Sequence, residues 1–184
     1  MAAKSNLKNM ALSLTLVCLV CSALLGVVYS MTAEPIRKAE EAKVAASIAR
    51  VLPACESLPA AEVVNVDGID YTYYVVPGSG SAIISTVGGF GGPLSLMVGI
   101  GEDGHVVNTV VLSHVETPGL GAKCTTDEAF INQFKDWDPA VKRLAVRKDG
   151  GDVDAITAST ITSRAYAKAI DNALGVYSKL SENE

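Results

Sequence analysis

The chain begins with a long apolar run, because no charged residue occurs between Asn9 and Ala33. A transmembrane helix needs about 20 predominantly apolar residues, so this run is long enough to cross a bilayer. Two lysines precede it, and the positive-inside rule places that basic end in the cytoplasm. The pattern therefore predicts a cytoplasmic N-terminus over residues 1–9, a transmembrane anchor over residues 10–31 and an extracytoplasmic remainder.

A cleaved signal peptide is the alternative interpretation of the apolar run. Its hydrophobic region would have about 7–15 residues and would end at a cleavage site with small residues. Here the core from Met10 to Val28 is longer, and the sequence VVYSMTAEP that follows has no A-x-A site. The pattern favours an uncleaved anchor.

After the anchor, apolar residues recur at roughly helical spacing through the sequence AEPIRKAEEAKVAASIARVLP. The spacing predicts a helix from about Pro35 to Leu52, since proline suits a first helical turn and Pro53 would end the helix. We assign residues 32–55 to a helical stalk that either lifts the domain off the membrane or packs on it. Residues 56–184 are assigned to an extracytoplasmic domain.

Short apolar runs punctuated by glycine come next, and such runs are typical of β-strands. An Asp-Gly pair at residues 103–104 is a strong hairpin signal. Strands are expected at residues 71–77, 81–89, 94–101, 105–115 and 141–150, and helices at residues 127–137 and from Thr160 or Ile161 to Leu180. This order predicts an α+β fold in which helices pack on an antiparallel sheet.

Composition narrows the class of protein. The 184 residues suit one domain rather than two, and 49% of them are apolar, which is enough for a sizeable core. Aromatic residues make up 5% and the net charge is −5, so nucleic-acid binding is disfavoured. Cys18 and Cys21 fall in the apolar run. Cys55 and Cys124 lie in the predicted exported part, where a disulfide and two unpaired thiols are both open.

Two segments carry candidate chemistry, and the first is SHVETPGLGAK at residues 113–123. Its Pro-Gly pair signals a turn, and its two glycines let the backbone approach a ligand closely because glycine has no Cβ. Glu116 and Thr117 would place a carboxylate and a hydroxyl at the mouth of this turn. The alternative is an ordinary glycine-rich loop with a solvated glutamate. His114 fits a strand residue satisfied in place better than a ligand or base.

The second segment is DAITASTITSR at residues 154–164, where hydroxyl side chains precede the last predicted helix. Serine and threonine cap helices by accepting hydrogen bonds from backbone N–H groups. A helix N-terminus is also a favourable place for an anion, because its N–H groups are free and the helix dipole is positive there. The segment is therefore either a phosphate site or a simple cap with turn-forming neighbours.

The sequence DAITASTITSRA resembles the flavinylation motif of the FMN-binding domain family, which reads approximately Asp-x-x-Ser/Thr-Gly-Ala-Thr. Aligned on the motif, Asp154 is the leading acid, Thr157 the Ser/Thr and Thr160 the acceptor. Ala158 and Ser159 stand where glycine and alanine are usual, and alanine replaces glycine easily only where φ is negative. In that family a dedicated flavin transferase joins the acceptor hydroxyl to the FMN phosphate as a phosphoester.

The first segment supports the same resemblance. SHVETPGLGAK is similar to a stretch typical of the G subunit of the Rnf ion-translocating electron-transport complex, which is related to the C subunit of the sodium-pumping NADH:quinone reductase. The resemblance covers about residues 94–180 and accommodates the anchor. It implies a phosphate at the start of the last helix and a flavin ring near the glycine-rich loop. The implied cofactor-binding residues are Thr160 as the covalent attachment point, with Thr162 in reserve, and Asp154, Thr157, Ser159, Glu116, Thr117, Gly119, Leu120 and Gly121.

The resemblance implies a membrane-anchored flavoprotein subunit with covalent FMN. It would relay electrons within an Rnf-type ferredoxin:NAD oxidoreductase complex in the bacterial cytoplasmic membrane, and would not turn over a small substrate alone. Its partners would be the other membrane subunits and the flavin transferase, and Glu116 would disfavour an anionic reduced flavin. The alternatives are the related C subunit, a stand-alone extracytoplasmic flavin-binding electron-transfer protein, and a non-redox domain whose threonines only cap a helix.

Overall fold

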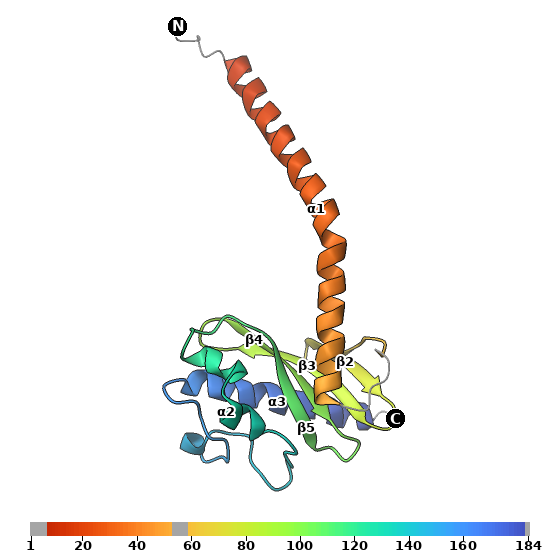
Figure 1. Ribbon diagram of the computed structural model, residues 1–184, viewed down its shortest axis with the longest axis vertical. Helices are drawn as coiled ribbons and strands as arrows, with labels where there is room; N and C mark the ends of the chain where they lie inside the picture. Colours follow the sequence, from red (N-terminus) through yellow and green to blue (C-terminus); the bar gives the residue numbers. More distant parts are fainter. Residues whose placement is uncertain (1–6, 53–58, 183–184) are drawn as a thin grey trace. The chain divides into compact units, whose positions relative to one another are not determined.

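The structure, a computed structural model, describes residues 7–52 and 59–182. The chain forms two compact units, the first ending at Lys43 and the second beginning at Val44. Helix α1 (Leu7–Val51) is drawn as one uninterrupted helix in Figure 1. The predicted helix start at Pro35 was wrong, because Pro35 lies inside α1. A proline inside a helix removes one backbone hydrogen bond, and the turns on both sides can maintain the helix.

The N-terminal part of α1 is strongly apolar, because no charged residue occurs between Asn9 and Ala33. An 18-residue window of α1 has a mean hydropathy of 2.5 and is fully exposed. By length and composition, α1 can cross a membrane. The boundary between the predicted anchor (residues 10–31) and the predicted stalk (residues 32–55) stays a prediction. It falls inside the single helix α1, which has no break there.

Five antiparallel strands in the second unit form one sheet, in the order of the sequence. Four of them lie close to predicted positions, but β1 was not predicted. The Asp67-Gly68 pair between β1 and β2 gave the same hairpin signal as residues 103–104. The strands are β1 (Glu62–Val66), β2 (Ile69–Val76), β3 (Gly80–Gly88), β4 (Pro93–Ile100) and β5 (Val106–His114).

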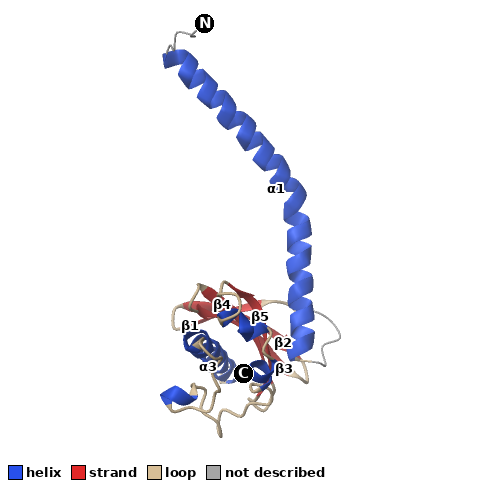
Figure 2. Cartoon of the chain, turned by 60° about the vertical axis from the view of Figure 1, so that its left-hand side comes forward, coloured by secondary structure: helices blue, strands red, loops and turns tan. Residues whose placement is uncertain are grey.

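Helix α3 (Thr160–Ser181) lies along one face of the sheet and contacts β3 and β4 (Figures 1 and 2). Tyr166, Ile170 and Ala173 are fully buried in the core on this face. They recur at helical spacing along α3, so they lie on its one apolar face. The arrangement confirms the α+β fold with helices packed on an antiparallel sheet.

The opposite face of the sheet has its own core. Side chains alternate between the two faces of a strand, so Met97 points away from Leu96. Met97 clusters with Ile48 and Val51 from the last turns of α1. A Cβ on Gly99 would lie only 2.5 Å from the carbonyl oxygen of Val51, so glycine is required where α1 meets the sheet. The end of α1 is therefore an integral part of the second unit.

The helix predicted at residues 127–137 is shorter in the structure. Helix α2 (Glu128–Asn132) begins at an Asp127 cap, whose carboxylate accepts hydrogen bonds from two backbone N–H groups. A left-handed residue, Asp136 with φ of 49°, prevents the helix from reaching Trp137. Trp137 instead forms a β-bridge with Val106. The helical pattern came from aromatic residues that pack around Tyr166.

The strand predicted at residues 141–150 was wrong. This segment forms turns, a short 3-10 helix (Arg147–Asp149) and a single bridge between Val146 and Val153. Gly150 adopts φ of 80°, which folds the segment back so that Arg147 N donates to Val153 O. Its backbone groups are satisfied locally, and no sheet neighbour is needed.

The hairpin between β4 and β5 carries a pH-sensitive contact at His105. Its Nδ1 lies 3.0 Å from Asp103 Oδ2, and its Nε2 lies 3.3 Å from Asp138 Oδ2. The hydrogen bond to Asp138, aided by the charge of Asp103, raises the pKa of His105 above its ordinary value. A group with a raised folded-state pKa stabilises the fold below its unfolded pKa of about 6.5, and that stabilisation is lost as pH rises through the folded-state pKa.

We therefore expect His105→Gln to destabilise the protein more in acid than in base. The urea midpoint of unfolding should fall clearly at about pH 5.5 and much less at about pH 8.5. Urea titrations of both proteins at the two pH values measure this difference. An equal loss at both would show that the charge of His105 is not involved.

Candidate functional site

A pocket of about 340 Å³ opens where the end of β5, the β3–β4 loop and the start of α3 meet. Its volume lies within the range of small-molecule sites, which is about 300–1,000 Å³. Both segments singled out in the sequence contribute to it. Its lining residues are Phe90, Glu116, Thr117, Leu120, Gly121, Ala158, Ser159, Thr160, Ile161 and Thr162.

Glu116 lies inside the site and not at its mouth, and only 5% of its surface is exposed. Its Oε1 accepts a hydrogen bond of 2.8 Å from Phe90 N, and its Oε2 accepts one of 2.8 Å from Thr162 Oγ1. Its own N–H donates to His114 Nδ1 over 3.2 Å. Glu116 thus ties together the three chain segments that form the pocket, so the alternative of a solvated glutamate is wrong.

The Glu116 carboxylate fits only because glycine stands beside it. A Cβ on Gly89 would lie 2.0 Å from Glu116 Oε1, and a Cβ on Gly121 would lie 2.4 Å from Oε2. Both distances are too short for any side chain. Gly89 and Gly121 therefore leave the space that the buried Glu116 carboxylate occupies.

The start of α3 is held by the side chain of Ser163, a residue in the first turn of the helix. Ser163 Oγ accepts a hydrogen bond from Ile156 N and donates one to the carbonyl of Ser159, each 3.0 Å long. The first helical backbone bond runs from Ser163 N to Ser159 O. Within the described part of the chain, three N–H groups of the first turn have no acceptor: those of Thr160, Ile161 and Thr162. Free donors at a helix N-terminus are suited to an anion.

The two threonines considered as attachment points differ in accessibility. Thr160 is half-buried and lines the pocket. Thr162 is buried to 1% exposure, and its hydroxyl is already donated to Glu116. Modification of Thr162 would break that bond and require the start of α3 to open.

Ala158 adopts φ of 60°, in the left-handed region that favours glycine. The condition that alanine replaces the motif's glycine easily only at negative φ is therefore not met. A left-handed conformation costs an L-residue with a Cβ about 1–2 kcal/mol. Ala158 therefore adopts, at an energetic cost, a backbone conformation that glycine adopts freely.

We expect Ala158→Gly to stabilise the protein by about 0.5–1 kcal/mol. Relief of left-handed strain exceeds the extra entropy of an unfolded glycine, which is about 0.4–1 kcal/mol. Urea unfolding of the full chain measures the change. Ala155→Gly, in the same exposed loop but without positive φ, is the matched control and should destabilise. A loss of stability in both variants would contradict strain at Ala158.

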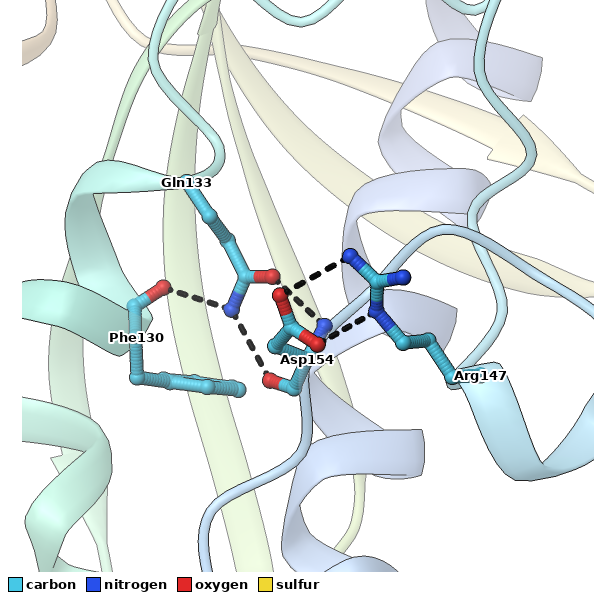
Figure 3. A network of polar contacts seen from close by, with 4 residues as sticks. All are labelled: Phe130, Gln133, Arg147 and Asp154. Carbon is cyan, nitrogen blue, oxygen red and sulfur yellow. Dashed lines mark hydrogen bonds and ion pairs between the residues drawn. The ribbon is translucent and has the colours of Figure 1, made fainter.

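The structure places Asp154, Thr157 and Gly119 outside the pocket lining. Asp154 is exposed, and its carboxylate forms a bidentate pair with the Arg147 guanidinium. Figure 3 shows how Gln133 holds the backbone on both sides of Asp154. Gln133 accepts from Asp154 N over 2.8 Å and donates to Asp154 O over 3.0 Å. Asp154 therefore fixes the segment that leads into α3.

Sequence reasoning missed Phe90 and Ile161 as lining residues. Phe90 is 66% exposed in the β3–β4 loop, and Ile161 is half exposed in the first turn of α3. The signal at Phe90 was the sequence GGFGGP, in which an aromatic side chain is surrounded by glycines. Such a residue has no neighbouring side chains to cover it, so it is available for a ligand.

Cys124 is buried and does not line this pocket. Burial, with the nearby negative charge of Glu116, raises the pKa of its thiol to about 11. Cys124 is therefore a neutral thiol at physiological pH and a poor nucleophile. Cys55 lies outside the described residues, so its pairing with Cys124 stays open.

A larger hollow, of about 730 Å³, lies beside the C-terminal half of α3. Its lining includes the carboxylates of Asp67, Asp103, Asp138 and Asp171. Lys179 pairs with Asp67, and His105 lies between Asp103 and Asp138, so the cationic side chains of this hollow are already engaged by carboxylates. The smaller pocket, with free N–H groups, is the better candidate for a nucleotide.

Comparison with known proteins agrees with this geometry. Residues 89–175 match the FMN-binding domain, and residues 1–51 match the RnfG N-terminal region. The G subunit of the ion-translocating oxidoreductase complex from Shewanella piezotolerans is 31% identical, over 91% of this chain and 87% of that relative. The corresponding protein from Stutzerimonas stutzeri is 33% identical, over 93% and 81%.

Two further relatives extend the comparison. The G subunit of the proton-translocating ferredoxin:NAD(+) oxidoreductase complex from Clostridium ljungdahlii is 38% identical, over 55% of this chain and 51% of that relative. The crystal structure of the C subunit of the Na(+)-translocating NADH-quinone reductase from Parabacteroides distasonis has the same fold. Its TM-score is 0.55 at 21% identity, over 77% of this chain and 94% of that one. This chain therefore belongs to the family of G subunits of ion-translocating oxidoreductase complexes.

Proposed function

We propose that this chain carries FMN covalently on Thr160 and relays electrons as a subunit of an Rnf-type ion-translocating ferredoxin:NAD oxidoreductase complex. The FMN-binding domain match and the G-subunit relatives support an electron-transfer flavoprotein in such a complex. The observation that carries the attachment site is the half-buried Thr160 hydroxyl beside three free N–H groups in a pocket. A nucleotide phosphate needs such a donor set.

The lining residues fit the two chemically different parts of FMN. The start of α3 offers N–H donors and a positive helix dipole to the phosphate. On the other side, Phe90, Leu120 and Ile161 offer exposed apolar surface to a planar ring. Apolar side chains with a few placed polar groups are typical of cofactor sites.

Bound FMN would supply the redox chemistry, and the protein would supply position and electrostatics. The residues of this chain then have distinct tasks. The first turn of α3 holds the phosphate, while Phe90 and Leu120 exclude water from the ring. Glu116 fixes the pocket floor through Phe90 and Thr162, and its charge would disfavour an anionic reduced flavin.

The covalent step requires a flavin transferase and an activated flavin nucleotide. The Thr160 hydroxyl loses its proton as its Oγ forms the bond to the FMN phosphorus. The bond from phosphorus to the leaving group of the activated nucleotide breaks in return, and the leaving group takes up a proton. The protein gains FMN less one water, without any change in oxidation state.

The apolar part of α1 supports anchoring in a bacterial cytoplasmic membrane, with the domain on the extracytoplasmic side. A covalent tether suits that location, because unattached FMN would be lost by diffusion. The partners would be the other membrane subunits of the complex. Their copurification with this chain from native membranes would separate this proposal from a stand-alone flavoprotein.

Intact and peptide mass spectrometry on protein from its native membrane tests the proposal. The expected result is the mass of FMN less one water on the peptide that contains Thr160. The same mass on Thr162 would keep the function and move the site. An unmodified chain, in cells that contain the transferase, would overturn covalent attachment.

A further inference from the structure

Ser159 carries a buried hydroxyl that has no hydrogen-bond partner within residues 7–52 and 59–182. Only 6% of the residue is exposed, and it lines the pocket at the position that caps α3. Its side chain makes no capping bond to the helix. A buried hydroxyl without a partner is costly, so natural structures rarely keep one without a reason.

The polar side chains of Ser163 and Glu116 form hydrogen bonds to other groups, and none to Ser159 Oγ in the described structure. Ser163 Oγ donates to the Ser159 carbonyl and accepts from Ile156 N. The Glu116 carboxylate accepts from Phe90 N and Thr162 Oγ1. Ser159 lines the pocket, so an acceptor bound there is the candidate partner for this hydroxyl.

The surroundings of Ser159 define the chemistry of that acceptor. The N–H groups of Thr160, Ile161 and Thr162 follow it in the chain and are also without acceptors in the described structure. A hydroxyl next to a row of N–H donors is a site for a group that only accepts hydrogen bonds and carries negative charge. An ionised phosphate meets both requirements.

We propose that Ser159 is a phosphate ligand of the flavin site, with its hydroxyl donated to a non-bridging oxygen of the FMN phosphate. This inference rests on the proposed function and deepens it. The family motif usually has alanine at this position, so the contact is an addition made by this chain. Ser159 binds the phosphate, and Thr160 remains the point of attachment.

Ser85 provides a matched control for the test. Its hydroxyl is also buried and without a partner in the described structure, but it lies in β3 and does not line the pocket. Replacing either serine with alanine removes an unsatisfied polar group, so both variants should keep or raise the melting temperature of the flavin-free protein. Only Ser159→Ala should affect a phosphate.

The experiment compares FMN with riboflavin, which lacks the phosphate. Full-length flavin-free chain, produced without the transferase in detergent, is titrated with each flavin. Ser159→Ala should weaken FMN binding by about 10- to 100-fold and leave riboflavin binding unchanged, because a hydrogen bond to a charged group is lost. Ser85→Ala should change neither. An equal loss for both flavins, or no loss for FMN, would overturn the inference.

A second measurement uses the flavinylated protein. The ³¹P resonance of the tethered phosphate should shift in Ser159→Ala and stay in place in Ser85→Ala. An unshifted resonance with intact flavin would overturn the role of Ser159 and leave the proposed function standing. If the wild-type chain binds neither flavin and carries none from its native membrane, the proposed function and the inference fail together.

Discussion

Thr160→Val should abolish covalent FMN completely while the protein remains folded. Valine has nearly the same shape as threonine and lacks only the hydroxyl that would form the phosphoester. Thr160 is the first residue of α3 and not its cap, which is Ser159, so α3 should keep its start. Intact mass spectrometry after coexpression with a flavin transferase measures the occupancy, and urea unfolding checks the fold.

Thr162→Val is the matched control, because it removes a second hydroxyl from the same helical turn. It should retain the FMN mass but lose about 1–3 kcal/mol of stability, since the Glu116 carboxylate loses a buried hydrogen bond. If Thr160→Val kept the FMN and Thr162→Val lost it, the attachment site would be Thr162.

Gly121→Ala should be strongly destabilising and should close the pocket beside Glu116, which we propose as the flavin site. The new Cβ would lie 2.4 Å from Glu116 Oε2 and 2.7 Å from Thr162 Oγ1. The carboxylate cannot move aside freely, because both of its oxygens are held by hydrogen bonds. Overpacking together with a broken buried hydrogen bond should cost about 2–4 kcal/mol. Urea unfolding measures the loss, and FMN occupancy should fall with it.

Gly175→Ala controls for the general effect of adding a methyl group. Gly175 lies in α3, and a Cβ there would meet nothing within 4 Å. Alanine is a better helix former than glycine, so this variant should gain up to about 1 kcal/mol. If Gly121→Ala were as stable as the wild type, the packing described around Glu116 would be incorrect.

The elements that the sequence predicted well have a local cause. Short apolar runs bounded by glycine-containing turns predicted β2 to β5, and helical spacing predicted α3 (Thr160–Ser181). These patterns arise because each element buries one side against the core. The segment at residues 141–150 failed because Val146 and Leu144 pack into the core from a loop. Apolar residues in a sequence indicate which positions are buried, but they do not indicate whether a strand or a loop buries them.

Pro35 and Trp137 show two ways in which tertiary structure overrides local signals. Pro35 suggested a helix start, but the long apolar run before it already forms the helix. Trp137 extended a helical pattern, but Asp136 turns the chain and Trp137 pairs with Val106. In both cases the deciding partner lies outside the short window from which a local prediction is made.

By itself, the sequence determined the α+β class, the apolar N-terminal helix and the two motifs on which the family resemblance depends. It did so because periodicity, charge and motif spacing are local properties of the chain. Only the tertiary structure decided that Glu116 is buried between Phe90 and Thr162, and that Asp154 fixes a loop outside the pocket. It alone also showed that Ser159, which lines the pocket, has a buried hydroxyl without a partner in the described structure. Burial and hydrogen-bond partners depend on segments far apart in the chain, and the fold alone brings those segments together.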